Sequence, residues 1–304
     1  MKKWGFLVIL VICLCFTFVK KEMSLQDKVE MQTHKINNKQ LDHKETSDSF
    51  QTKVITKELV YQGNLLLINQ KYPVHQESIK SDVVNLYTHK ELKKGFELND
   101  TKIELSADVA RKFSDMIVAA KKEGVRHFTI NSGFRDFDEQ NALYQQMGSD
   151  YALPAGRSEH NLGLSLDVGS TEMKMNEAPE GKWLEKNAWK YGFIIRYPKD
   201  KTAITGIQYE PWHIRYIGLP HSVIMKEKNF SLEEYLDFIK EQKSISTTIH
   251  DEKYEISYYP ITKNTTIQVP TNLRYEISGN NIDGVIVTVF NNSTNNLKED
   301  SLAE

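Results

Sequence analysis

The sequence predicts an α+β fold in which a small antiparallel sheet is flanked by helices. Segments with helical spacing of apolar residues and segments with strand-like alternation are short. They do not follow one another in the regular strand-helix repeat of a doubly wound parallel sheet. From about residue 244 onwards, strand patterns follow one another with no helix between them. We therefore expect one mixed domain, 59–242, followed by a small β appendage, 244–292.

Capping and turn residues set the expected bounds of the elements. Ser106 is placed to cap a helix that ends at Gly124, because glycine favours the backbone conformation that follows a helix. Asp136 and Glu139 have the spacing of a capping box for the next helix, which ends near Gly148. The remaining expected elements are a buried segment at 65–68, strands at 125–131, 164–168, 193–197 and 212–217, and helices at 180–191 and from 231.

The N-terminal region indicates export. Residues 1–22 hold an unbroken apolar run between lysines, which is typical of a signal peptide or a membrane anchor. No small-x-small cleavage site follows, so we favour an uncleaved single-pass anchor in the cell membrane. Residues 23–58 are polar with few large apolar side chains, as in a tether that does not fold alone. The polar end of the chain, 293–304, is expected to fray.

Composition excludes several classes of function. The formal net charge of −2 gives no basic footprint for nucleic acid. Both cysteines, Cys13 and Cys15, lie in the apolar N-terminal run. The rest of the chain therefore has neither a disulfide framework nor thiolate metal ligands.

Two short segments carry the residues for a metal site: Ser-Glu-His-Asn-Leu-Gly-Leu-Ser-Leu-Asp and, further on, Glu-Pro-Trp-His. Their His160, Asp167 and His213 can hold a tetrahedral Zn²⁺ with the fourth position left for water. Gly163 permits a sharp turn that brings His160 and Asp167 to a single ion. Any one of these residues alone is more often structural. The combination favours one Zn²⁺ per chain.

Glu210 lies three residues before His213 and is not needed as a ligand. Beside a zinc ion, its carboxylate can take a proton from water and pass it to a leaving amine, as the glutamate of zinc peptidases does. Without the metal, the same residue would be an exposed carboxylate at the end of a strand.

These motifs resemble those of the VanY-type D-alanyl-D-alanine carboxypeptidases. The resemblance rests on Ser-x-His-x-x-Gly-x-x-x-Asp, on Glu-x-x-His and on the Ser-Gly-Phe-Arg of 132–135, and it covers roughly 60–240. It implies the family's antiparallel fold, which is shared with Hedgehog signalling domains. It also implies a zinc enzyme that removes the C-terminal D-Ala from peptidoglycan pentapeptide stems. That removal destroys the terminus to which vancomycin-class antibiotics bind.

The resemblance also implies roles for residues outside the ligand set. Arg135 is assigned to the substrate carboxylate or the oxyanion, since a planar guanidinium suits either. Ser132, Ser158 and Gln140 are candidate substrate contacts, although serines near turns often bond only to the local backbone. Trp212 is a candidate wall of the cleft, with core packing as the alternative.

Other functions remain open at this stage. A VanX-type dipeptidase would cleave free D-Ala-D-Ala, but that dipeptide is cytoplasmic and the N-terminal run indicates export. A non-catalytic, zinc-containing peptidoglycan-binding module is a second alternative. The resemblance implies an extracytoplasmic catalytic domain that acts on pentapeptide stems or on lipid-linked precursors. The reaction is that of the serine D,D-carboxypeptidases, but the expected mechanism is metal-dependent.

Overall fold

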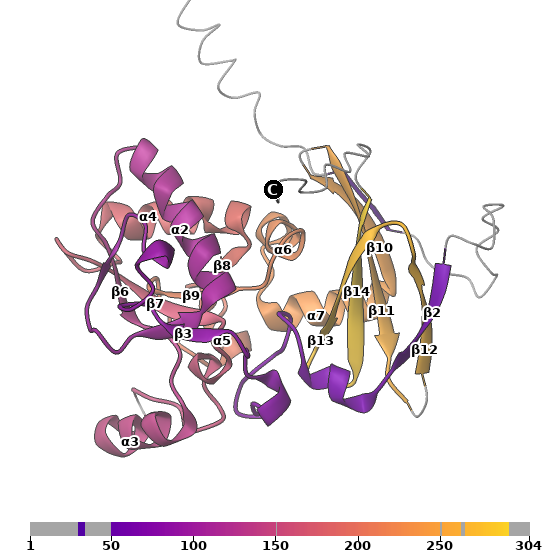
Figure 1. The fold of residues 1–304 in the computed structure, drawn as a ribbon, viewed down its shortest axis with the longest axis horizontal. Coiled ribbons are helices and arrows are strands. Elements are labelled where there is room, and N and C mark those ends of the chain that lie inside the picture. Colours follow the sequence, from indigo (N-terminus) through magenta and orange to yellow (C-terminus); the bar gives the residue numbers. More distant parts are fainter. Residues whose placement is uncertain (1–29, 34–49, 150, 250, 263–264, 292–304) are drawn as a thin grey trace, which may run out of the picture.

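The computed structural model describes residues 30–33, 50–149, 151–249, 251–262 and 265–291, with only the backbone described for 30–33. Two five-stranded sheets lie on opposite sides of the molecule, and helices α6 and α7 lie between them (Figure 1). The mixed α+β class expected from the sequence is confirmed.

The first sheet has the strand order β4-β6-β7-β9-β8 and carries the motif residues. Its neighbouring strands are antiparallel except for the parallel pair of β4 and β6. Phe113 and Met116 of α2 are fully buried and belong to the same core as Ile130 of β6 and Ile214 of β9. The strands are β4 (Glu97–Leu98), β6 (Phe128–Ser132), β7 (Ser165–Ser170), β8 (Phe193–Ile195) and β9 (His213–Tyr216).

The helices begin where the capping residues predict. Ser106 accepts a hydrogen bond from the backbone of Val109, and Asp136 accepts one from Glu139. Ser231 forms a full capping box at the start of α7. The helices are α2 (Ala107–Lys122), α3 (Phe137–Met147), α4 (Pro179–Asn187), α5 (Thr202–Thr205), α6 (His221–Lys228) and α7 (Leu232–Gln242), and the 3-10 turns are η1 (Lys57–Tyr61), η2 (Gln76–Ser78), η3 (Lys90–Leu92), η4 (Glu159–Leu162) and η5 (Ala188–Tyr191).

The second sheet, with the order β1-β10-β11-β14-β13, contains the expected appendage. It is accompanied by the two-stranded ribbon β12-β2, and a further short pair, β3-β5, lies near the first sheet. The strands are β1 (Glu30–Thr33), β2 (Phe50–Ile55), β3 (Val83–Asn85), β5 (Glu104–Ser106), β10 (Ser244–Ile249), β11 (Glu252–Pro260), β12 (Thr265–Pro270), β13 (Arg274–Gly279) and β14 (Gly284–Asn291).

The region 23–58, expected to be a polar tether that does not fold alone, contributes two strands to this part of the fold. β1 pairs with β10, and β2 pairs with β12. Ile55 is 2% exposed and packs in a cluster with Val269 and Val285. Residues 30–33 and 50–55 are therefore not a free tether, because their backbones pair with strands more than 190 residues further along the chain.

The β appendage is also not separate from the mixed domain. Leu236 of α7, Ile245 of β10, Ile256 of β11 and Ile286 of β14 belong to one hydrophobic cluster with Leu65 from the start of the mixed domain. The helix-to-strand boundary at Lys243 therefore divides the secondary structure but not the core.

The described residues include no helix that is long and apolar enough to cross a membrane. The anchor expected at 1–22 and the tail expected at 293–304 lie outside the part of the chain that the structure describes.

Candidate metal centre

Three neighbouring elements position the candidate ligands. His160 lies in η4, which begins at the cap Ser158 and ends at Gly163, whose φ of 82° is the left-handed conformation that glycine favours. The chain then enters β7, which carries Asp167. His213 is the first residue of β9 and lies directly opposite Asp167 in the antiparallel pairing of the two strands. The sharp turn and the strand pairing together bring the three side chains to one place.

The ligand atoms of His160, Asp167 and His213 lie within 4.8 Å of one another. His160 Nε2 is 3.3 Å from Asp167 Oδ2, and His213 Nδ1 is 3.0 Å from Asp167 Oδ1. Both imidazoles are buried, and the Asp167 side chain is 22% exposed. The cluster is therefore open to solvent on the side of the carboxylate.

The second nitrogen of each imidazole has its own partner. His160 Nδ1 donates to the backbone carbonyl of Gly133 at 2.5 Å, so His160 Nε2 is the free nitrogen that faces Asp167. His213 Nε2 lies 3.4 Å from Glu159 Oε2, which leaves His213 Nδ1 facing Asp167. Ligating histidines usually bond in this way through the other nitrogen. The donor set, its orientation and its spacing fit a divalent metal ion.

The electrostatics of the cluster keep negative charge at its centre. Burial alone would raise the pKa of Asp167, but His160 and His213 lower it well below its ordinary value. Burial lowers the pKa of His160, which favours the neutral ligand form. Burial also opposes the charge on His213, yet its hydrogen bonds to Asp167 and Glu159 raise the pKa to about 9. A metal ion at this site would compete with a proton for His213 Nδ1.

Glu210 lies on the segment that leads into β9, where its backbone N–H donates to the carbonyl of Tyr197 at 3.0 Å. Its side chain is half-buried, and burial raises its pKa, while His213 and Arg135 act in the opposite direction. The carboxylate is close enough to His213 and Asp167 to interact electrostatically with both. That Glu210 acts as the general base stays a prediction.

Arg135 follows β6 and lies on the same side of the site as His160, to whose carbonyl its backbone N–H donates at 3.2 Å. Burial lowers its pKa, and Asp167, Glu139 and Glu210 partly restore it. Its Nε is buried and has no hydrogen-bond partner among the described residues. A buried guanidinium nitrogen without a partner is suited to an incoming anion.

The other three candidate substrate contacts differ in their hydrogen-bond partners and surroundings. The hydroxyl of Ser158 accepts from the backbone N–H of His160, which is the local bond typical of a turn serine. Ser132 pairs with Asp167 across β6 and β7. Gln140 is 1% exposed and donates to the Leu153 carbonyl at 2.6 Å, while its Oε1 is buried without a partner in the described structure.

Trp212 is 40% exposed and is not a core residue. With Tyr209, Pro211 and Val168 it lines a cavity of about 420 Å³. That Trp212 forms a wall of the substrate cleft stays a prediction.

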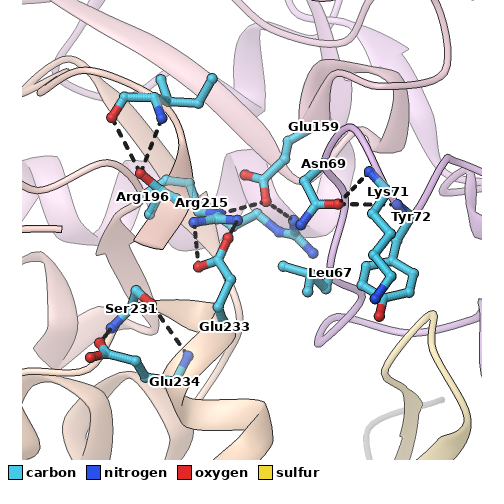
Figure 2. A network of polar contacts seen from close by, with 12 residues as sticks. Leu67, Asn69, Lys71, Tyr72, Glu159, Arg196, Arg215, Ser231, Glu233 and Glu234 are labelled. Carbon is cyan, nitrogen blue, oxygen red and sulfur yellow. Dashed lines mark hydrogen bonds and ion pairs between the residues drawn. The ribbon is translucent and has the colours of Figure 1, made fainter. Parts of the chain in front are cut away.

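Sequence reasoning missed one buried residue of the site, Glu159. Its carboxylate accepts from Arg196 Nε and from Arg215 Nη1, both at 2.8 Å (Figure 2). It also accepts from the hydroxyl of Ser165 at 3.2 Å. These two arginines are about 1% exposed or less and hold the pKa of Glu159 far below its ordinary value, against the effect of burial. The sequence did contain a signal for this role: Arg196 directly follows the apolar strand β8, Arg215 lies within β9, and Glu159 precedes the candidate ligand His160.

Comparisons with known proteins agree on one family. The family model described as "VanY: D-alanyl-D-alanine carboxypeptidase" matches residues 102–219. A D-alanyl-D-alanine carboxypeptidase of Enterococcus faecium is 65% identical over 97% of this chain and 98% of its own length. A bifunctional D-Ala-D-Ala dipeptidase and carboxypeptidase, VanXYC of Enterococcus gallinarum, is 34% identical over 58% of this chain and 95% of its own.

A solved structure has the same fold. The vancomycin resistance D,D-dipeptidase VanXYg, in complex with a D-Ala-D-Ala phosphinate analogue, superimposes with a TM-score of 0.69 at 34% identity. The match covers 79% of this chain and 99% of that one. Fold, residue set and relatives define a metallo-carboxypeptidase of the D-Ala-D-Ala peptidase class. Within that class, the chain belongs to the VanY family of D-alanyl-D-alanine carboxypeptidases.

Proposed function

We propose that the chain is a zinc D,D-carboxypeptidase with one Zn²⁺ held by His160, Asp167 and His213. The observation that carries the proposal is the orientation of the two histidines: His160 Nδ1 and His213 Nε2 are engaged, so the remaining nitrogens converge on Asp167. Two histidines and one carboxylate are the ligand set of hydrolytic zinc sites, which keep a fourth position open. A bound zinc ion would polarise a carbonyl and lower the pKa of a water molecule.

The side chains around the ligands supply the remaining chemistry. Glu210 takes the proton of the attacking water and delivers it to the amine of the departing D-alanine. Arg135, with its partnerless Nε, binds the substrate carboxylate or the charge that develops on the carbonyl oxygen. Trp212 and the cavity beside it accommodate the part of the stem that precedes the scissile bond.

The proposed substrate is a peptidoglycan pentapeptide stem, free or on a lipid-linked precursor, that ends in D-Ala-D-Ala. Loss of the terminal D-Ala removes the binding site of vancomycin-class antibiotics and so contributes to resistance. We propose that the N-terminal apolar run anchors the chain in the cell membrane with the catalytic region outside the cytoplasm, where such stems are displayed.

Turnover of a synthetic stem pentapeptide by the purified protein tests the activity directly. We expect release of one equivalent of D-alanine, loss of turnover with a chelator, and recovery on addition of Zn²⁺. A protein that binds the pentapeptide but releases no D-alanine would be a non-catalytic peptidoglycan-binding module.

Cleavage of free D-Ala-D-Ala is the second candidate activity. VanXYC is named as both a dipeptidase and a carboxypeptidase, and this chain covers nearly all of it. Comparing kcat/KM for the dipeptide and the pentapeptide separates the two. We expect the pentapeptide to be preferred, because the cavity beside Trp212 offers surface that a dipeptide does not fill.

Replacing His160 tests the metal site. We expect His160→Ala to lose nearly all bound zinc, since only two ligands remain, His213 and the partly exposed Asp167. Metal analysis after dialysis measures the loss. His127→Ala is the matched control, because His127 is exposed and bonds only to nearby polar side chains. Stoichiometric zinc in the His160 variant would show that the ligand set is wrong.

Replacing Arg135 tests anion recognition. We expect Arg135→Ala to lower kcat/KM more than Arg135→Lys does, because lysine retains the charge but loses the planar fork. Amidating the C-terminus of the pentapeptide should abolish cleavage by the wild type if Arg135 binds the terminal carboxylate. If amidated and free peptides are cleaved equally, Arg135 acts on the oxyanion alone and the enzyme has endopeptidase character.

A further inference from the structure

A chain of buried ion pairs runs from α7 to the metal ligand His213. Glu233, in the first turn of α7, binds Arg196 through both carboxylate oxygens, at 2.7 and 3.1 Å. Arg196 Nε donates to Glu159 Oε1 at 2.8 Å, and Glu159 Oε2 lies 3.4 Å from His213 Nε2. Figure 2 shows Glu233, Arg196, Arg215 and Glu159 together. We call Glu233, Arg196 and Glu159 the ion-pair chain.

The β region, by which we mean residues 244–291, is connected to the ion-pair chain by α7. Leu236 and Ile239 of the same helix belong to one hydrophobic cluster with Ile245 of β10 and Ile256 of β11. The position of Glu233 is thus set by packing against the second sheet. The same helix presents a carboxylate to Arg196 and apolar side chains to the second sheet.

A second connection leads from Glu159 to the same sheet. Arg215 bonds to Glu159 and also donates to the backbone carbonyls of Asn64 and Leu66, at 3.0 and 3.1 Å. The segment containing these carbonyls is bound to the β13–β14 turn, since Leu65 N donates to Ser278 Oγ at 2.8 Å and Asn281 Nδ2 donates to the Leu67 carbonyl at 2.9 Å. Arg196 and Arg215 therefore both connect Glu159, the partner of His213, to elements that pack on the second sheet.

We propose that the β region is a working part of the metal centre, because through α7 and the ion-pair chain it fixes the orientation of His213. The proposal rests on the function proposed above, in which His213 is a zinc ligand, and it makes Glu233 a positioning residue. Stability alone is a weak reason for such a network, since buried ion pairs can often be replaced by apolar side chains of similar volume without loss. A fixed imidazole is a stronger reason, because partners of ligating histidines tune metal affinity.

The test is the metal affinity of full-length variants, measured by competition with a chromophoric chelator, together with the visible spectrum of the Co²⁺-substituted protein. Glu159→Gln should weaken binding by about 10- to 100-fold, the range for a direct partner of a ligand. Glu233→Gln acts two residues further away, through Arg196 and Glu159, and should weaken binding by about three- to tenfold and shift the Co²⁺ bands. Glu241→Gln, on the exposed end of the same helix, should match the wild type.

A double-mutant cycle separates positioning from general destabilisation. If Glu233 acts through Glu159, the double variant should bind metal no more weakly than Glu159→Gln alone. Arg196→Lys, which cannot bridge both carboxylates, should resemble Glu233→Gln, and it takes the place of that variant if the latter does not fold. A Glu233→Gln protein with a lower melting temperature but wild-type affinity and Co²⁺ spectrum would overturn the proposal. A wild type that binds no zinc would instead refute the proposed function.

Discussion

Replacing Glu210 by glutamine should lower kcat by about 10²- to 10⁴-fold, the contribution of a well-positioned acid or base. Glutamine keeps the shape of the side chain but accepts no proton. Because Glu210 is outside the ligand cluster, bound zinc and the melting temperature should remain at wild-type values. Pentapeptide turnover, metal analysis and thermal unfolding of the same preparation measure the three quantities.

The control for this variant is Glu185→Gln, which removes the carboxylate of an exposed residue of α4 outside the ligand set. It should retain full turnover. An active Glu210→Gln protein with normal zinc would show that a different group takes the proton. Loss of zinc together with loss of activity would show that Glu210 supports the metal rather than the proton transfer.

Replacing Glu159 by alanine should destabilise the fold by about 3–5 kcal/mol, the usual effect of removing one partner of a buried ion pair. Arg196 would keep Glu233, but Arg215, which is fully buried, would lose its only carboxylate among the described residues. Chemical denaturation of the metal-free proteins measures the difference without a contribution from zinc binding. Glu276→Ala removes one side of an exposed pair with Arg274 and should change stability by less than about 1 kcal/mol.

The pH dependence of this difference has a definite sign. Burial opposes ionisation of Glu159, but Arg215 and Arg196 lower its folded-state pKa well below the ordinary 4.5. The stabilisation is therefore fully present above pH 4.5 and is lost as the pH falls towards the folded-state value. Wild type and Glu159→Ala should converge in stability in strong acid. A constant difference down to low pH would mean that packing, rather than charge, accounts for it.

The parts of the structure that obey local rules could be predicted from the sequence. Ser106, Asp136 and Ser231 cap helices because their side chains bond to backbone groups within three residues. Gly163 adopts the left-handed conformation expected of the turn between His160 and Asp167. The antiparallel fold class followed from the order of short strands and helices, and it is confirmed.

The features that were missed depend on partners remote in the chain. Five of the six residues of β2 are exposed, so nothing in its own pattern indicates a strand, and its partner β12 begins 210 residues after it ends. Glu159 lies between two motif residues, but its role depends on Arg196 and Arg215, which are 37 and 56 residues away. Alternation and spacing contain no information on such contacts.

The direct pairing of Asp167 with His213 also bears on how relatives of this chain can diverge. Three backbone pairs between β7 and β9, the last of them Asp167 with His213, fix the two ligands side by side. The 45 residues between them form α4, η5, β8 and α5 and include much of the cleft wall. Insertions or deletions there can reshape substrate access while the ligand spacing is preserved, so specificity can evolve without rebuilding the catalytic centre.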